Sequence, residues 1–399
     1  MTGVSSLGRA LSNIDRLQEQ QTLLDKLAVQ LSTGRKTQSF TGLGTQVIAS
    51  QRAHTSINTI QTYVDNISAA DTRMELTLQA IEEFKLQAEN FDAALKGFMQ
   101  EGAHQLGEPV YYDDPLTPEV ENTLIGYTSA EADVELQTLQ DMAASLYDYM
   151  IDLVNSKDGN RYLLSGANTD TAPLSNTGAL TSAMSSKFTA WQNGTLTTDD
   201  FIADIEDRSI DGGNLDALTD TVVGYSSTLS ADTAGRVFVR VDTHSEIDYT
   251  VLGDDQGFRD IMVALSFFKS EDLGPIADQV EIDATTGLPV VITEGAPGAT
   301  IDEQTDNFYA IFNNLSGMVN RAIDELDQQR FRIESARARI NDIKSNYLEE
   351  KSLLQSTIDD IENVDINEVA VHITALQTQL EASYTVTAVT QSLSLINFL

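Results

Sequence analysis

The chain has 399 residues, no cysteine and a formal net charge of −37 at neutral pH. Its length predicts two or three domains, and the absence of cysteine excludes disulfide bonds and thiolate metal sites. The excess of acidic residues argues against binding to nucleic acid or to an anionic membrane surface, because both need clustered Lys and Arg.

The N-terminal region lacks a basic segment followed by an apolar one, so we expect no cleavable signal peptide. Residues 5–32 instead have the spacing of a coiled-coil helix, in which apolar or small residues recur in steps of three and four. The positions are Leu7, Ala10, Ile14, Leu17, Gln21, Leu24, Ala28 and Leu31, with Gln21 as the polar exception. Gly34 ends the pattern, and Gly42 and Gly44 predict a loose connection.

Two further helices are predicted before residue 160. The first covers about residues 45–100, and the second covers about residues 128–156. The seam of the first is Ile57, Ile60, Val64, Ile67, Asp71, Met74, Leu78 and Ile81, followed by Phe84, Phe91 and Phe98. The seam of the second is Leu136, Leu139, Ala143, Leu146, Met150 and Leu153. Prolines and glycines between residues 101 and 126 predict a connecting loop.

The composition changes after Gly159, where Asp, Thr, Ser and Gly become frequent. Residues 236–242 alternate like a strand, and so do Ile247, Tyr249 and Val251. Residues 280–283 and 288–293 predict a hairpin, and residues 258–268 a short helix. This region is therefore predicted to be a separate, β-containing domain inserted between helices.

The longest predicted helix covers residues 308–361, and every seventh residue from Phe312 is apolar. The row is Phe312, Val319, Leu326, Ile333, Ile340, Tyr347, Leu354 and Ile361. A helix of this length extends roughly 80 Å at ~1.5 Å per residue, and it cannot bury such a stripe alone. Its companion row begins with Phe308 and Leu315 but fades to small and polar residues, whereas a dimeric coiled coil keeps both rows apolar. We therefore expect this helix to pack along one stripe against the chain's own N-terminal helices.

A last helix follows a pause near residues 363–365 and carries Ile366, Val369, Ile373, Leu376 and Leu380 at the same spacing. The predicted fold class is mainly α, with long antiparallel terminal helices forming coiled-coil-like bundles and an inserted mixed β-containing middle domain. We expect residues 1–40 with 362–399 to form a terminal coiled-coil domain for inner assembly. Residues 41–165 with 301–361 form the predicted helical bundle, and residues 166–300 form the variable outer domain. No apolar run reaches about 18 residues, so no transmembrane helix is expected.

Candidates for chemistry are few. The four histidines, His54, His104, His244 and His372, have no zinc-site spacing, and the sequence contains no nucleophile elbow, phosphate loop or dinucleotide-binding fingerprint. Residues 211–216 and 363–367 carry alternating oxygen ligands that allow a calcium site, although solvated turns or a helix cap explain them better. We predict no catalytic, cofactor or metal site and no enzyme activity.

A basic strip runs beside the long apolar row: Arg330, Arg337, Lys344 and Lys351 recur at intervals of seven. Two interpretations are open. The strip is either a solvated face with local ion pairs, or a surface that meets acidic neighbours in an assembly.

Three segments carry a resemblance to a known family. Residues 17–36 end in Gln-Leu-Ser-Thr-Gly-Arg-Lys, residues 160–170 read Asn-Arg-Tyr-Leu-Leu-Ser-Gly-Ala-Asn-Thr-Asp, and the chain ends in Leu-Ser-Leu-Ile-Asn-Phe-Leu. In these segments the chain resembles the flagellin superfamily and, within it, the hook–filament junction (third hook-associated) branch. The terminus favours that branch, because filament flagellins usually end in a tail rich in glutamine and alanine. Residues 39–44 depart from the aspartate-rich turn that relatives commonly carry.

The resemblance implies a structural subunit of the bacterial flagellum, exported by the type III apparatus without a cleaved signal and located outside the cell at the hook–filament junction. Its implied partners are copies of itself in a ring or helical layer, the adjoining hook-associated protein, flagellin and an export chaperone. The implied assembly interface comprises Leu7, Ile14, Leu17, Leu24, Leu31, Ile366, Val369, Ile373, Leu376, Leu380, Tyr384 and Leu393. The intrachain bundle seam comprises Ile57, Val64, Ile67, Met74, Leu78, Leu139, Leu146 and the apolar row Phe312 to Leu354.

Two alternatives remain open. One is a filament-forming flagellin. The other, ranked lower, is a secreted adhesin or enzyme with its activity in the middle domain.

Overall fold

The structure is a computed structural model that describes residues 3–100, 107–113, 123–129, 134–209, 216–270 and 273–396. The chain divides into two compact units. Unit 1 comprises Met1–Asp65 and Ile343–Leu399, and unit 2 comprises Asn66–Asp342. Two long helices, α2 (Val47–Gln100) and α9 (Ile301–Glu362), contribute residues to both units. Among the described residues, no helix is long and apolar enough to cross a membrane.

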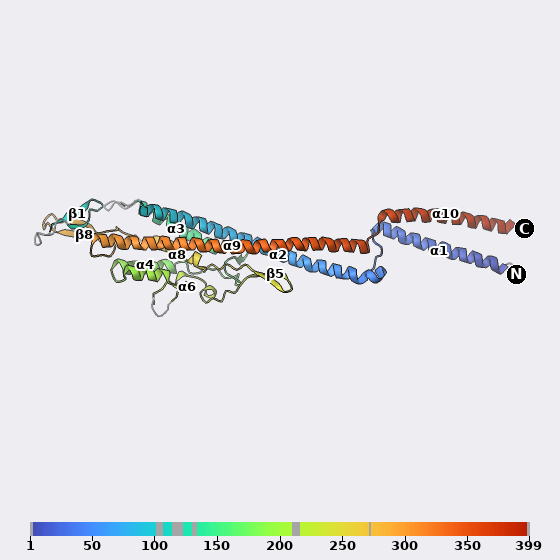
Figure 1. The fold of residues 1–399 in the computed structure, drawn as a ribbon, viewed down its shortest axis with the longest axis horizontal. Helices are drawn as coiled ribbons and strands as arrows, with labels where there is room; N and C mark the ends of the chain where they lie inside the picture. Colours follow the sequence, from blue (N-terminus) through green and yellow to red (C-terminus); the bar gives the residue numbers. More distant parts are fainter. Residues whose placement is uncertain are drawn as a thin grey trace. The chain divides into compact units, whose positions relative to one another are not determined.

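Unit 1 contains the helices nearest the two ends of the chain. The helices α1 (Gly3–Thr33) and α10 (Ile366–Ile396) lie side by side (Figure 1). They are joined at one end by a short antiparallel bridge between Arg35 and Asn363. The Lys36 amide donates to the Glu362 carbonyl at 2.6 Å, and the Val364 amide donates to the Gly34 carbonyl at 2.9 Å. A 3-10 helix, η1 (Phe40–Gln46), connects α1 to the start of α2.

The core of unit 2 is built around α8 (Gln256–Ser270), a helix in which every residue from Gly257 to Phe268 is buried. It lies against α3 (Val134–Val154) and α4 (Ala179–Gln192). Aromatic contacts join it to the long helices: Phe258 meets Phe84 of α2 at 4.9 Å between ring centroids, and Phe268 meets Phe312 of α9 at 5.1 Å. A helix that is buried on all sides is stable only when other elements surround it, and its buried Arg259 is paired with Asp260 at 3.1 Å.

We expected α9 to pack along one apolar stripe. In unit 2 this expectation is wrong, because α8 also packs against α9. Phe308, Leu315 and Ala322 of the companion row are as deeply buried as the row that begins at Phe312. The row from Phe312 faces α2, where Phe98 lies 5.4 Å from Phe312 between ring centroids. Phe312 also meets Phe267 and Phe268 of α8, and Gly257 of α8 lies beside Ala322, so α8 is a second neighbour of α9 that the heptad pattern of α9 could not indicate.

The predicted loop between residues 101 and 126 is also corrected, because it contains strands. β1 (Pro109–Tyr112) and β2 (Thr123–Tyr127) form an antiparallel hairpin. The predicted hairpin near residues 280–293 is present as β7 (Gln279–Ile282) and β8 (Pro289–Thr293). The two hairpins join, through a parallel contact between Tyr127 and Gln279, into one four-stranded sheet of order β1-β2-β7-β8.

Gly126 allows the two hairpins to meet. Its φ of +158° lies outside the range that L side chains favour, and a Cβ there would lie 2.6 Å from the Asp278 carbonyl oxygen. It would also lie 2.8 Å from a methyl carbon of Val280. Only glycine therefore fits between β2 and β7.

The rest of the middle region is more helical than the sequence predicted. Besides α4 and α8 it contains α5 (Thr198–Glu206), α6 (Asp220–Val223) and α7 (Ser227–Ser230). Two small hairpins complete it: β3 (Lys157–Asp158) with β4 (Arg161–Tyr162), and β5 (Phe238–Asp242) with β6 (Ser245–Asp248). The chain is thus mainly α with an inserted region that contains β-structure.

Candidate assembly surfaces

The pairing of α1 and α10 buries part of the predicted interface. Val369, Leu376 and Leu380 of α10 are 6–8% exposed. Leu17, Leu24 and Ile373 are half-buried. The side chains of Leu7 and Leu393 lie outside the described residues.

Gln21, the one polar residue in the α1 seam, has a specific partner in α10. Its Nε2 donates to the Tyr384 hydroxyl at 2.7 Å. Both side chains are exposed, so this hydrogen bond contributes little free energy but sets the alignment of the two helices.

Many apolar side chains of this helix pair remain open to solvent. Each of the following is at least 38% exposed. On α1 they are Leu11, Ile14, Leu23, Val29 and Leu31, and on α10 they are Ile366, Val371, Tyr384, Val386 and Val389. Ile14, Leu31, Ile366 and Tyr384 belong to the predicted interface, whereas Leu11, Leu23, Val29, Val371, Val386 and Val389 were missed.

The missed residues of α10 form a second apolar face. At about 100° per residue, Val371 and Val389 lie about 200° around the helix from Val369. That is the side opposite the face that α1 covers. Between Ile366 and Ile396 the only acidic side chains are Glu368 and Glu381, and there is no Lys or Arg. The scarcity of charged residues in α10 is a sequence signal for a second apolar face. A search for a single heptad seam overlooks it.

Within unit 1, Glu362 at the end of α9 bonds to side chains of α2. Its Oε1 accepts a hydrogen bond from Ser50 Oγ at 2.6 Å and lies 2.8 Å from His54 Nε2. The hydrogen bond from Ser50 and the contact with His54 lower the pKa of Glu362. A catalytic serine would donate to the histidine, whereas here both side chains bond to the same carboxylate oxygen. The arrangement is a structural junction.

The intrachain seam is mostly buried where it was predicted. Val64, Ile67, Met74, Leu78, Leu139, Phe312, Val319, Leu326, Ile333 and Ile340 are at most 7% exposed. Ile57, Leu146, Tyr347 and Leu354 are half-buried. In α3 the buried positions after Ala143 are Tyr147, Met150 and Val154, in place of Leu146 and Leu153.

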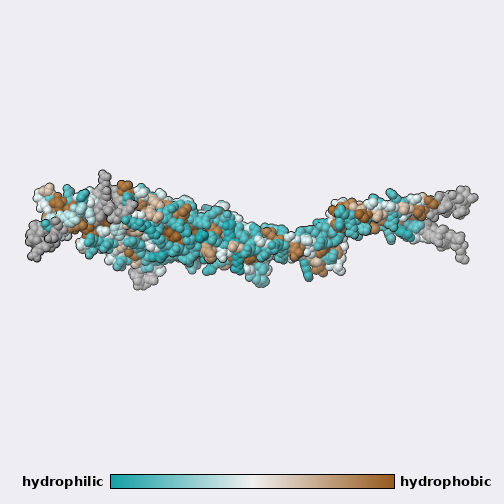
Figure 2. Space-filling view, turned by 45° about the horizontal axis from the view of Figure 1, so that its top comes forward, coloured by the Kyte–Doolittle hydropathy of each residue, from teal (hydrophilic) through white to brown (hydrophobic). Residues whose placement is uncertain are grey.

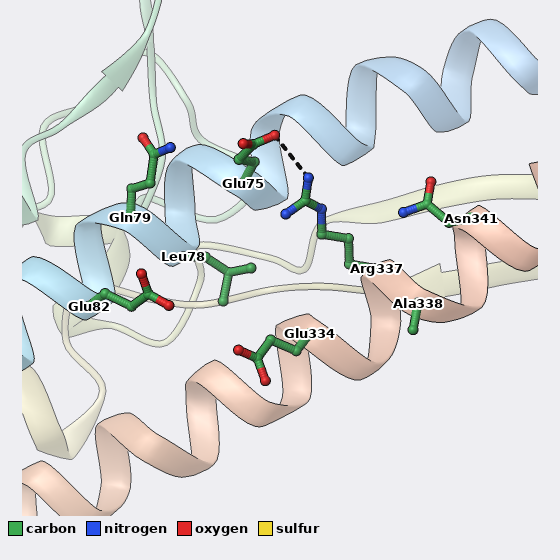
Figure 3. Close-up of a pocket in the computed structure, with 8 residues that line it drawn as sticks. All are labelled: Glu75, Leu78, Gln79, Glu82, Glu334, Arg337, Ala338 and Asn341. Atoms are coloured by element: carbon green, nitrogen blue, oxygen red, sulfur yellow. Dashed lines mark hydrogen bonds and ion pairs between the residues drawn. The ribbon is translucent and has the colours of Figure 1, made fainter.

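The basic strip on α9 is occupied largely within the chain. Arg337 donates to Asp71 at 2.6 Å and to Glu75 at 2.9 Å, both on α2. Figure 3 shows Arg337 reaching across the groove between α2 and α9 toward Glu75. The hydrogen bond with Asp71 raises the pKa of Arg337.

Two other members of the strip, Arg330 and Lys351, also form hydrogen bonds within the chain. Arg330 bonds to its helix neighbours Asp327 and Glu334 at 3.3 and 3.0 Å, and Lys351 donates to Gln61 of α2 at 2.5 Å. These contacts favour the interpretation as local and intrachain pairs. Ion pairs that are this exposed to solvent add little to the stability of the fold, because water screens the charges.

The segment at residues 160–170 is a structural turn held by a buried arginine. Arg73 of α2, 4% exposed, donates from Nη2 to the carbonyls of Tyr162 at 2.7 Å and Leu163 at 3.2 Å. Gly166 has a φ of +64°, and a Cβ there would lie 2.5 Å from the Gly235 carbonyl oxygen. Sequence reasoning missed Arg73, because nothing in its helical row distinguishes it from an exposed arginine.

A partly buried polar cluster includes Asp254, which lies just before α8. Arg208 donates to Asp220 at 2.7 and 2.9 Å and to Asp254 at 2.9 Å. Burial raises the pKa of Asp254 to about 6, and Arg208 opposes this shift. A carboxyl with such a pKa can act in acid–base chemistry. Asp254 is only 9% exposed, however, so we interpret the cluster as structural.

The predicted ligand clusters have structural roles or lie outside the described residues. Asp365 Oδ1 accepts from the Asn367 amide at 2.8 Å and so caps α10. In the part of the chain that the structure describes, no three His, Asp or Glu side chains are placed to hold a metal ion. His104 and residues 211–215 lie outside the described residues.

The comparison with known protein families concerns the part of the chain that contains the two-faced helix α10. Residues 316–399 match the bacterial flagellin C-terminal helical region. This match supports membership of the flagellin superfamily. The match also supports a structural subunit of the flagellum that lies outside the cell and assembles with copies of itself. No curated protein matches the chain.

Proposed function

We propose that this chain is the adaptor that joins hook to filament in a bacterial flagellum, and that it is incorporated through α1 and α10. The observation that supports incorporation through these helices is the second apolar face of α10, on the side away from α1. Val371 is 68% exposed and Val389 52% exposed on a helix with only two acidic residues. Such a face is costly in water, so a neighbouring copy covers it in the assembled state.

In this proposal the terminal helices form an inner layer. The interface comprises the predicted residues on α1 and α10 together with the newly found face of α10. Residues 1–40 with 362–399 then act as the inner domain, residues 41–165 with 301–361 as the bundle, and residues 166–300 as the outer domain. The flanking partners are a hook-associated protein and flagellin, and a chaperone covers the terminal helices before type III export.

The junction position rests on the apolar terminus of the chain, which resembles that of the junction branch. A strain that lacks residues 381–399 of this protein should therefore carry hooks without filaments and release filament protein into the medium. Normal motility in that strain would contradict the proposal.

A pair of point variants tests the second face directly. Val371→Glu with Val389→Glu places charge on the face and should abolish incorporation. Gln377→Glu adds a charge at an exposed position on the flank of the same helix and should be incorporated normally. Equal incorporation of both proteins would show that the face is not an interface.

A filament-forming flagellin is the second candidate, favoured by the identity of the matching family. The two candidates differ in self-assembly. A flagellin polymerises alone into long filaments, whereas an adaptor remains in short layers or monomers. Electron microscopy of the purified full chain after seeding separates them.

A further inference from the structure

Within the part of the chain that the structure describes, the four-stranded sheet of unit 2 has two open edges. β1 forms one edge and β8 the other, since the strand order is β1-β2-β7-β8. Along each edge strand, alternate backbone N–H and C=O groups point away from the sheet and are free to pair with another strand. Proteins usually block such edges with charged side chains or cover them.

The strand β8 is apolar on both faces, and both faces are open. Val290, Val291 and Ile292 are 51%, 47% and 52% exposed, and Leu288 before them is 52% exposed. Successive residues of a strand point to opposite sides, so neither side of β8 is covered. At the other edge, Tyr111 of β1 is 53% exposed. Figure 2 shows hydrophobic side chains at the end of unit 2 that carries this sheet.

Both edges also lack charge. β1 reads Pro-Val-Tyr-Tyr, and residues 288–293 read Leu-Pro-Val-Val-Ile-Thr. In a chain with a net charge of −37, two copies repel each other over most of their surfaces. These two uncharged strands are places where copies can approach closely.

The strand directions fix how two copies would fit. β1 is antiparallel to β2, β2 is parallel to β7, and β7 is antiparallel to β8. Hence β1 and β8 run in the same direction at opposite edges. A neighbour placed beside the molecule without inversion would bring its β1 against β8 in a parallel pair. Contacts of this head-to-tail kind repeat from copy to copy and build rings or helices.

We propose that β8 of one copy pairs with β1 of the next, so that the sheets of neighbouring subunits form a continuous belt. This occupant is favoured over a second β8, because a β8–β8 contact would be closed after two copies and would not continue around a layer. The inference rests on the proposed function in one respect, namely that identical copies stand side by side. It adds an interface formed by unit 2 to that formed by α1 and α10.

Disulfide trapping tests the belt, since the chain has no cysteine of its own. Tyr111→Cys and Val291→Cys are combined in the full chain. Within one copy the two sites are separated by three strand spacings, about 14 Å, which is too far for a disulfide. Oxidation of assembled protein should therefore give a ladder of covalent multimers, and each single variant should remain monomeric.

The matched control combines Leu86→Cys with Phe238→Cys, two sites of unit 2 that are each 49% exposed and lie off the sheet. A ladder no stronger than that of this control would overturn the proposal. Covalent dimers from Val291→Cys alone would also overturn it, in favour of a β8–β8 contact. Incorporation into flagella without cross-links refutes the belt and leaves the adaptor role intact. Cross-links in purified protein that never enters flagella refute the adaptor role instead.

A second variant guards against misfolding of the double mutant. Val291→Lys should weaken concentration-dependent association in sedimentation, whereas Phe238→Lys should not. The fluorescence of Trp191, which is buried in unit 2, reports whether each variant is folded. Equal association of the two folded lysine variants would contradict the pairing of β8.

Discussion

Replacing Phe312 with alanine should remove the aromatic contact between α2, α8 and α9 and destabilise unit 2. Phe312 is fully buried in the structure. Its ring meets four others, with centroid distances of 4.5 Å to Phe308, 5.1 Å to Phe268, 5.4 Å to Phe98 and 6.0 Å to Phe267.

The magnitude follows from burial and from these ring pairs. A buried Phe→Ala change costs about 3–5 kcal/mol, and aromatic pairs contribute roughly 0.5–1.5 kcal/mol each beyond burial. Because the four neighbouring rings come from α2, α8 and α9 itself, we expect a loss of about 4–5 kcal/mol. That is a change of at least about a thousandfold in the unfolding equilibrium. Phe312→Leu keeps most of the volume and should cost about 1.5 kcal/mol.

Denaturant unfolding followed by tryptophan fluorescence measures this loss. The chain has a single tryptophan, Trp191 of α4, which is 1% exposed. It connects to Phe312 through Phe188 and Phe267, with centroid distances of 5.4 and 5.5 Å for the first two steps. The reporter therefore lies in the same core as the substitution.

The same helix supplies the control. Phe331 is also a phenylalanine of α9 but is 71% exposed, so Phe331→Ala should change stability by less than about 0.5 kcal/mol. A loss below about 1 kcal/mol for Phe312→Ala, or equal losses for the two variants, would refute the view that α8 and α9 share one core.

Three further predictions concern other parts of the chain. Because the pKa of Asp254, about 6, exceeds its unfolded value near 3.9, its contribution stabilises unit 2 at low pH and is lost as the pH rises through about 6. Asp254→Asn should remove that slope, worth up to about 3 kcal/mol, from Trp191-monitored unfolding between about pH 4 and pH 8. Gly126→Ala should separate the two hairpins and accelerate amide exchange in β2 and β7, and unchanged exchange would show that the close approach is not required. In a verified monomer, α1 and α10 should exchange far faster than α8 and should become protected on assembly. Strong protection of both in the monomer would count against their role in assembly.

The periodicity of the sequence was sufficient to identify the long helices. α1, α2, α3, α9 and α10 are each found close to the ranges that the three-four spacing predicted. Helical periodicity is a local property, because it depends only on which residues share one face of the same helix. For the same reason the hairpin of β7 and β8 was recognised from its alternating strands and turn.

Which helices and strands pack against one another became clear only from the tertiary structure. Nothing in the heptads of α9 indicates that residues 256–270 pack beside them and meet Phe312. Likewise, β1 and β2 were hidden among prolines and glycines that predict a loop, and β2 finds β7 about 150 residues later in the chain. Contacts over such separations depend on the shapes of both surfaces, which a pattern along one segment does not contain.

The candidate assembly surface divides in the same way. The heptad seam and the resemblance at the two ends were readable from residues such as Leu376 and Leu380. Its second face required the structure, because a helix with few charged residues carries apolar residues on more than one side. Only the position of α1 shows that Val369 is covered and that Val371 and Val389 are left open. The sequence by itself determined which segments are helical and that they need partners, and the tertiary structure decided which faces those partners leave uncovered.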